Sequence, residues 1–337
     1  GNYIVKELRA PLGYYVNEEP MEVTFTYDGQ AVMVLDNTCS NKPTEMWVSK
    51  RDLTNDEELP GATLAIKDMD GNIVTTWVST DEPHRVTGLH FGESYTLTEI
   101  RAADGYAMAD DITFRLIQKT DEGGNPLEEC EVYYLTTKNI LFWKWDDWRL
   151  LDDATVIMRD DITKVQISKK DLTTKEELPG AELTLTDEKG NEIDRWVSTD
   201  APHYMERLPA GKYTLTEVTA PDGYAIAERV EFEVLPTGEV QTFEMFDDTI
   251  KVKISKVDIT TNEELPGAEL VIKDKDSTEI DRWISTNEPH YVEKMPAGDY
   301  TLTEITAPNG YKVAESISFT VLPTGEMQTL SLIHISE

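Results

Sequence analysis

The sequence has few cysteines, no long hydrophobic run and no leader-like start. Its two cysteines, Cys39 and Cys130, lie far apart in segments that do not resemble each other, which excludes a disulfide framework and a cysteine-ligated metal site. No segment reaches the roughly 18 consecutive apolar residues of a membrane span. No basic and apolar signal peptide opens the sequence, and we expect no membrane insertion in this part of the protein.

Basic residues are also scarce. There are 31 Lys and Arg against 65 Asp and Glu, which gives a formal net charge of −34. A charge of this sign repels nucleic-acid phosphates and anionic membrane surfaces, so nucleic acid is excluded as a partner. Aromatic content of 9% and hydrophobic content of 39% are typical of folded proteins, and we expect the 337 residues to form about two to four domains with acidic surfaces.

Internal repeats divide the chain. Leu178–Ala181 recurs as Leu265–Ala268 and Tyr213–Glu217 as Tyr300–Glu304, with one offset of 87 residues (265 − 178 = 300 − 213 = 87). Earlier copies of these motifs are Leu59–Ala62, Tyr95–Glu99 and the partial copy Tyr3–Glu7. We predict four modules: the C-terminal part of a truncated module at 1–44, complete modules at 45–162 and 163–249, and a module at 250–337 that is incomplete at its last strand.

The pattern within a repeat predicts an all-β fold. Apolar and polar residues alternate in short runs, and turn dipeptides such as Asp70-Gly71 and Lys189-Gly190 separate the runs. This pattern is typical of antiparallel strands in a β-sandwich. The module at 45–162 is longer than the next one, and the extra residues form an insert at about 119–153. Single histidines, His84, His203 and His290, recur in the repeats, and we expect them in loops and not at a metal site.

Three kinds of charged residue continue the apolar faces of strands. Lys169 shares a face with Val165 and Ile167, because alternate side chains of a strand point to the same side of the sheet. By the same test a glutamate follows the inward Tyr and Leu of each Tyr-x-Leu-x-Glu element, and an aspartate ends the last strand. The inward residues are Lys50, Lys169 and Lys256; Glu99, Glu217 and Glu304, with Glu7 in the partial copy; and Asp160 and Asp247.

Burial of these charges has two interpretations. One is a hydrogen-bonded ion network, which rarely stabilises a fold more than apolar residues do. The other is chemistry, because desolvation favours a neutral amine and a protonated carboxylic acid. A neutral Lys169 amine would then attack the Asp247 carboxyl carbon while protonated Glu217 relays protons, and the product is an amide that joins two strands. Such a reaction occurs once per molecule, so the chain is not a conventional enzyme.

The motifs resemble those of the collagen-adhesin B-type (CnaB) modules, also called SpaA-like pilin domains. The resemblance rests on Ile167–Asp171, on Tyr213–Tyr224 with its Ala-Pro-x-Gly-Tyr ending, and on Met245–Asp247. It implies tandem prealbumin-like, immunoglobulin-like β-sandwich modules without a cofactor. It also implies intramolecular isopeptide bonds from Lys50 to Asp160 and from Lys169 to Asp247, catalysed by Glu99 and Glu217. The implied setting is the cell wall or surface of a Gram-positive bacterium.

The two end modules depart from this pattern. In the last one, His334 occupies the position equivalent to Asp247, so Lys256 and Glu304 are expected to lack an acceptor. The closing Ser331–Glu337 also loses the polarity of the repeat and resembles translated sequencing-adapter read-through. In the partial first module, Glu7 has no lysine partner, and its acceptor is Asp36 by motif or Asn37 by interval.

Two functions follow as alternatives. The first is a structural or adhesive stalk in which each module contacts its neighbours and the whole is linked by a sortase to a pilus or cell wall. The second is an adhesin whose aromatic insert binds a host protein or glycan, with the other modules as spacers. The insert aromatics are Tyr133, Tyr134, Phe142, Trp143, Trp145 and Trp148. Packing of these side chains on their own module or on the neighbouring one is the simpler expectation.

Overall fold

The fold is described by a computed structural model that covers residues 1–17, 19–27, 29, 34, 36, 38–140 and 143–334. Strands dominate, and one short 3-10 turn, η1 (Asp152–Ala154), is the helical element of the described residues. The chain divides into two compact units. Unit 1 contains Gly1–Lys164, Glu206–Ala210 and Leu235–Glu239, and unit 2 contains Val165–Met205, Gly211–Val234 and Val240–Glu337. The predicted all-β fold is confirmed.

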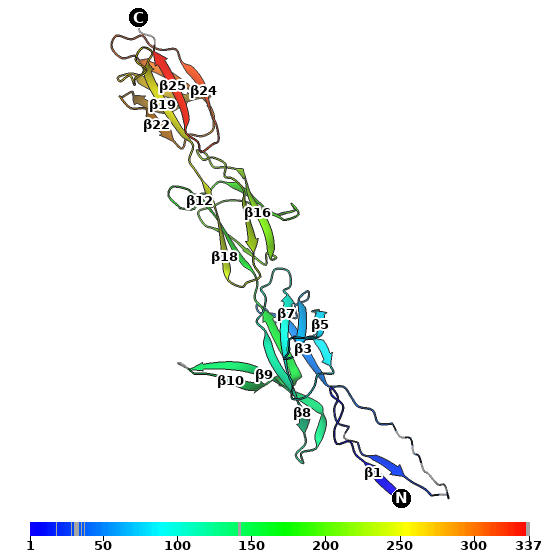
Figure 1. Ribbon diagram of the computed structural model, residues 1–337. Coiled ribbons are helices and arrows are strands. Elements are labelled where there is room, and N and C mark those ends of the chain that lie inside the picture. The colour runs from blue at the N-terminus through cyan, green and yellow to red at the C-terminus, as the bar shows by residue number, and fades with distance from the viewer. Residues whose placement is uncertain are drawn as a thin grey trace. The chain divides into compact units, whose positions relative to one another are not determined.

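Unit 1 consists of a hairpin and a β-sandwich. The hairpin pairs β1 (Asn2–Val5) with β2 (Met21–Thr24), and the sandwich packs the sheet β11-β3-β6 on the sheet β10-β9-β8-β7-β4-β5. The sandwich strands are β3 (Glu45–Asp52), β4 (Thr63–Lys67), β5 (Ile73–Val78), β6 (His84–Thr87), β7 (Ser94–Arg101), β8 (Ile112–Thr120), β9 (Pro126–Ile140), β10 (Trp143–Leu150) and β11 (Thr155–Asp160). Strands β9 and β10 form a long hairpin that projects from this sandwich (Figure 1).

Unit 2 contains two further sandwiches, each made of a three-stranded sheet and a four-stranded sheet. The first packs β15-β12-β18 on β14-β13-β16-β17, and the second packs β22-β19-β25 on β21-β20-β23-β24. The first has β12 (Lys164–Asp171), β13 (Glu182–Asp187), β14 (Glu192–Val197), β15 (His203–Glu206), β16 (Gly211–Thr219), β17 (Val230–Val234) and β18 (Val240–Asp247). The second has β19 (Lys251–Asp258), β20 (Glu269–Asp274), β21 (Glu279–Ile284), β22 (His290–Glu293), β23 (Gly298–Thr306), β24 (Ile317–Val321) and β25 (Gln328–His334).

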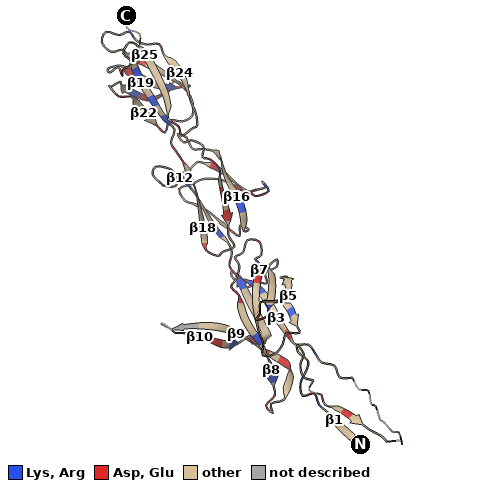
Figure 2. Cartoon of the chain, viewed as in Figure 1, with Lys and Arg blue, Asp and Glu red and all other residues tan. Residues whose placement is uncertain are grey.

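Alternation along the strands builds each core. In β7 the side chains of Tyr95 and Leu97 are buried, and in the opposite sheet Met46 and Val48 of β3 meet them in one hydrophobic cluster. Burying each large apolar side chain stabilises the fold by about 1.5–3 kcal/mol. Asp and Glu residues recur along the strands and loops of both units (Figure 2), and few of them are buried, so most of the negative charge lies in solvent. In the described part of the chain, no helix is long and apolar enough to cross a membrane.

The first and last strands of the unit 1 sandwich lie side by side. Strand β11 runs parallel to β3, with Met158 opposite Lys50 and Asp160 opposite Asp52. In unit 2, β18 is likewise the neighbour of β12, and β25 is the parallel neighbour of β19. A side chain near the end of the first strand is therefore within reach of one near the end of the last strand.

Candidate functional site

Each sandwich buries one lysine in its core. Lys50 on β3 is 1% exposed, and Lys169 on β12 and Lys256 on β19 are each 2% exposed. Their neighbours two and four residues earlier on the same strand face are buried apolar side chains, as the alternation predicts. Removing an ammonium group from water costs several kcal/mol unless it is well paired. Each lysine therefore requires a partner inside the core.

A buried glutamate is the first partner. The Nζ atom lies 3.0 Å from Glu99 Oε1 for Lys50, 3.1 Å from Glu217 Oε1 for Lys169 and 3.3 Å from Glu304 Oε1 for Lys256. The second carboxylate oxygen of each glutamate accepts the backbone N–H of an alanine ten positions later, as in Ala227 to Glu217 at 2.6 Å. This bond fixes the orientation of the carboxyl group.

A β-bulge follows each glutamate. In the pairing of β13 with β16, Leu183 lies opposite Glu217, whereas the preceding Glu182 lies opposite Thr219, so Val218 is the extra residue. The same shift occurs after Glu99 and after Glu304. Bulges bend a strand and redirect its side chains, and they are common beside functional sites. Here the bulge ends the alternation directly after the inward-facing acid.

Aspartates complete two of the three sites. Lys50 Nζ donates to Asp160 Oδ1, and Lys169 Nζ donates to Asp247 Oδ1. Both aspartates are buried, and the second oxygen of each, Oδ2, has no hydrogen-bond partner among the described residues. Burial raises the pKa of Asp160 and of Asp247 to about 7, against the opposing effect of the lysine. The structure thus places the lysine, the glutamate and the aspartate of each of these two modules in one buried cluster.

The third sandwich has the lysine and the glutamate in the same arrangement. Its last strand places His334 opposite Asp258, which is the position that Asp160 takes opposite Asp52 in unit 1. Burial lowers the pKa of Lys256, while Glu304 acts in the opposite direction. The register thus agrees with the expectation that His334 occupies the acceptor position.

In the partial first module, the contacts of Glu7 differ from those predicted for its acceptor. Glu7 Oε2 accepts the N–H of Asn17, ten positions later as in the other copies, and also accepts from Asn41 Nδ2 at 2.6 Å. Asp36 is exposed and belongs to no strand, and Asn37 lies outside the described residues.

Backbone contacts identify the residue of the first copy that is equivalent to Asp160 and Asp247. An isolated bridge joins Tyr106 to Ile162 and another joins Tyr224 to Thr249, in each case two residues after the buried aspartate. The corresponding bridge in the first copy joins Tyr14 to Pro43, so the residue in the equivalent position is Asn41, and not the predicted Asp36 or Asn37. Asp36 was chosen by motif and Asn37 by residue interval, and an interval fails where the intervening loop changes length.

The described aromatic residues of the insert pack on their own module. Tyr134 contacts the hydrophobic core, and the Arg115 guanidinium lies 4.2 Å from the ring centre of Trp148 and 5.9 Å from that of Tyr133. Phe142 lies outside the described residues, and Trp143 and Trp145 are described by their backbone alone.

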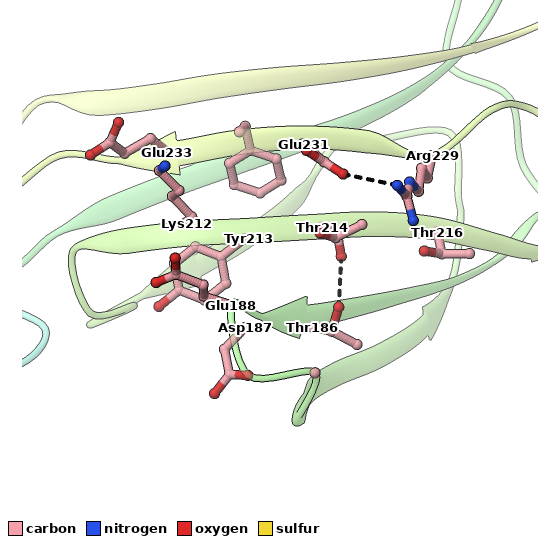
Figure 3. Close-up of a pocket in the computed structure, with 12 residues that line it drawn as sticks. Thr186, Asp187, Glu188, Lys212, Tyr213, Thr214, Thr216, Arg229, Glu231 and Glu233 are labelled. Atoms are coloured by element: carbon pink, nitrogen blue, oxygen red, sulfur yellow. Dashed lines mark hydrogen bonds and ion pairs between the residues drawn. The ribbon is translucent and has the colours of Figure 1, made fainter.

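A surface hollow of about 740 Å³ on β13, β16 and β17 is lined by charged side chains of both signs, including the pair of Arg229 and Glu231 at 3.3 Å (Figure 3).

Sequence reasoning missed a second repeat feature, in which each sandwich stacks a tryptophan on a histidine, as in Trp196 and His203 with ring centres 4.2 Å apart. These histidines begin strands β6, β15 and β22, so their predicted place in loops is wrong.

Comparison with solved structures gives relatives of low identity. The chain is similar to the Bacillus anthracis TIE protein, at 23% identity and a TM-score of 0.42, over 87% of this chain and 52% of that one. It thus spans about half of that relative. It is similar to BcpA, the major pilin subunit of Bacillus cereus (14% identity, TM-score 0.32, 87% of this chain and 99% of that one). It is also similar to the shaft pilin SpaA from Lactobacillus rhamnosus GG (14%, 0.26, 61% and 97%). No curated protein matches the chain.

A family model gives the assignment. The model of the SpaA prealbumin-like fold domain matches residues 44–124, 163–249 and 250–333, which is more than half of the chain. The matched segments contain the three buried lysines and the three glutamates beside them. The chain therefore belongs to the SpaA family of prealbumin-like fold domains and carries three matched copies in tandem.

Proposed function

We propose that the chain is a structural stalk whose modules at 45–162 and 163–249 cross-link themselves through Lys–Asp isopeptide bonds. One observation carries the proposal. In both modules the lysine Nζ contacts one oxygen of a buried aspartate, while the other oxygen has no hydrogen-bond partner among the described residues. An ion pair gains nothing from such an oxygen, because burying it costs free energy. In a condensation the same oxygen is the leaving group.

The reaction balances as a dehydration. Within the pair, a proton moves from the Lys169 ammonium to the Asp247 carboxylate, which gives a neutral amine and a carboxylic acid. The Nζ lone pair attacks Cγ, a C–N bond forms, the C–Oδ2 bond breaks, and the oxygen leaves as water with one proton from nitrogen and one already on the acid. The elevated pKa of Asp247, about 7, makes the first transfer accessible near neutral pH.

Glu217 is the proton carrier in this scheme. Its Oε1 lies 3.1 Å from Lys169 Nζ, so it can take a proton from the attacking nitrogen and return it to the departing oxygen. Its Oε2 is held by the Ala227 N–H at 2.6 Å, which keeps Oε1 directed at the lysine. Holding the amine and carboxyl in contact replaces an encounter in solution and supplies a large effective concentration. Glu99 has the same place in the 45–162 module.

The cross-link gives the module its mechanical role. The bond joins the first and the last strand, β3 to β11 and β12 to β18, which are neighbours in one sheet. A force applied to the two ends of a module therefore passes through the amide and does not separate the strands. This property suits a chain of tandem modules on the surface of a Gram-positive cell wall, attached through a sortase. Solved relatives named as pilins agree with that setting.

The first module fits the same scheme with a different acceptor. Asn41 takes the position of Asp160 and Asp247, and its side chain donates to Glu7. An asparagine acceptor forms the same amide with a lysine and releases ammonia in place of water. We propose Asn41 as the acceptor of this module.

Peptide mapping tests the cross-link directly. Trypsin cleaves after Lys164, Lys170, Arg229 and Lys251, but not after an acylated lysine. We expect a branched peptide in which residues 165–170 and 230–251 are joined, one water lighter than the two parts together. Recovery of residues 165–169 and 230–251 as separate, unmodified peptides in full yield would disprove the bond.

A binding function of the insert is the second candidate, because the β9–β10 hairpin projects from its module (Figure 1). The register pairs Thr136 with Asp147, so residues 137–146 can be replaced by a short glycine turn without disturbing Tyr133, Tyr134 or Trp148. We expect this variant to keep its melting temperature and its cross-links. Loss of binding to immobilised host matrix proteins or to a glycan array, at unchanged stability, would identify the hairpin as the ligand-binding surface.

A further inference from the structure

Arg207 contacts two side chains that are distant in sequence. Its Nη2 donates to Asp52 Oδ2 at 3.0 Å, and its guanidinium lies 4.8 Å from the ring centre of Tyr106. The Tyr106 hydroxyl donates to the same Asp52 oxygen at 2.8 Å and is also hydrogen-bonded to Arg207 Nη1. All three residues belong to unit 1, although Arg207 lies in the second segment matched by the family model and the other two lie in the first.

Unit 2 repeats the arrangement with a lysine. Lys294, one repeat after Arg207, donates from Nζ to the Tyr224 hydroxyl at 2.6 Å and lies 4.9 Å from the ring centre. The Tyr224 hydroxyl donates to Asp171 Oδ2 at 2.6 Å, and Lys294 Nζ lies 3.5 Å from that oxygen. Tyr224 and Asp171 lie in the second matched segment and Lys294 in the third. Two independent junctions thus place a cation on a tyrosine and aspartate pair.

The backbone at both cations is strained. Arg207 and Lys294 have φ values of 60° and 58°, in the left-handed region that residues with a β-carbon rarely adopt. Their N–H groups donate to Thr163 at 3.0 Å and to Ile250 at 2.9 Å, at the start of the matched segment in which each cation lies. Such strain persists where surrounding contacts compensate for it.

A glycine next to each tyrosine lets the backbone of Arg207 or Lys294 come close to the preceding module. A β-carbon at Gly105 would lie 2.6 Å from the Arg207 carbonyl oxygen, and one at Gly223 would lie 2.5 Å from that of Lys294. The first hairpin shows the same backbone contact, because a β-carbon at Gly13 would lie 2.5 Å from the Gly88 oxygen. Gly88 stands one repeat before Arg207 and carries no side chain, so the backbone contact forms without the cation there. The cation is an addition to the junction and not a requirement of the fold.

We propose that Arg207 and Lys294 are clamps that fasten each module to the one before it, by inserting a cation between the tyrosine ring and the aspartate of the preceding module. The clamp adds a cation–π contact and a charge-assisted hydrogen bond to the backbone contact of the junction. Within each unit it adds side-chain contacts that the Gly13–Gly88 backbone contact does not have among the described residues. The proposal does not depend on the isopeptide bonds.

In the second clamp, the aspartate Asp171 and the cation Lys294 stay charged over a wide pH range. Burial by itself raises the pKa of Asp171, but hydrogen bonds from the Tyr224 hydroxyl and from backbone N–H groups bring it down to about 2. The Tyr224 contact raises the pKa of Lys294. A depressed aspartate pKa stabilises the folded form above its unfolded value of about 4, and this contribution is lost as pH falls towards 2. The clamp therefore persists at neutral and mildly acidic pH.

Hydrogen exchange of the full chain tests the clamp. In Arg207→Ala we expect the amides at position 207, Thr163 and Ala107 to exchange roughly tenfold faster, because local opening of the junction becomes easier. The amides around Ile250 and Lys294 should be unchanged, and Lys294→Ala should give the converse result. Arg207→Lys should keep native protection, since lysine performs this role at the other junction. Lys212→Ala, which removes an exposed cation elsewhere, is the matched control.

Two results would overturn the proposal. The first is native exchange at the junction amides in Arg207→Ala. The second is faster exchange throughout the 163–249 core, including the amides of β13 and β16, because Arg207 would then stabilise the fold of its own module and not the junction.

Discussion

Glu217→Ala is expected to leave the 163–249 module without its cross-link and to lower its melting temperature by roughly 20 °C. Lys169 and Asp247 are 78 residues apart in sequence. Closing a loop of this size restricts the unfolded chain and stabilises the fold by about 4–5 kcal/mol in the chain-entropy treatment used for disulfides. A change of 1 kcal/mol shifts the melting temperature of a small domain by about 4–8 °C. Without the bond, Lys169 and Asp247 also remain a buried ion pair.

Intact mass and calorimetry together check this result. The variant chain should be one water heavier than a chain carrying both bonds, after allowance for the substitution, and its calorimetric transition should split because the 45–162 module is unaffected. Glu231→Ala, on the exposed face of the same sheet, removes an acid without touching the site and should change neither quantity. Full cross-linking in Glu217→Ala would remove the glutamate from the mechanism.

His334→Asp is expected to create a third cross-link. Lys256 and Glu304 are already in place, with Nζ 3.3 Å from Oε1. Position 334 lies opposite Asp258 in a parallel pair, as Asp160 lies opposite Asp52, so an aspartate there occupies the register of an acceptor. We expect the chain to lose one further water and the melting temperature of the last module to rise by roughly 20 °C.

The control for this gain is His334→Ala, which removes the imidazole without supplying a carboxyl group and should lose no water. Combining His334→Asp with Glu304→Ala should abolish the added bond, which separates catalysis from mere proximity. If His334→Asp folds with native stability but its mass shows no further loss, then register alone does not make an acceptor.

Local alternation made the buried residues predictable. Lys50, Lys169 and Lys256 continue apolar strand faces, and the glutamates follow two buried residues of their own strands, so their inward direction follows from the period of a strand. Register across the sheet was also recoverable where the repeats keep one length, as for Asp247 and His334. Asn41 was missed because the intervening chain differs in length. Its signal was Thr44, three residues later, which matches Thr163 three residues after Asp160.

Contacts between distant segments were not predictable from the sequence. Arg207 and Asp52 are 155 residues apart, and no periodicity relates them. The left-handed φ of Arg207 and the close approach at Gly105 depend on the folded junction. The packing of Tyr133 and Trp148 around Arg115 similarly depends on how β8, β9 and β10 pair.

The intact mass of the purified native chain tests the cross-linking account most directly. Mass spectrometry of the denatured, reduced protein should give a value two waters below the mass calculated from the sequence, one from Lys50 and Asp160 and one from Lys169 and Asp247. A mass equal to that of the unmodified sequence would contradict the account and leave the two sites as buried ion pairs.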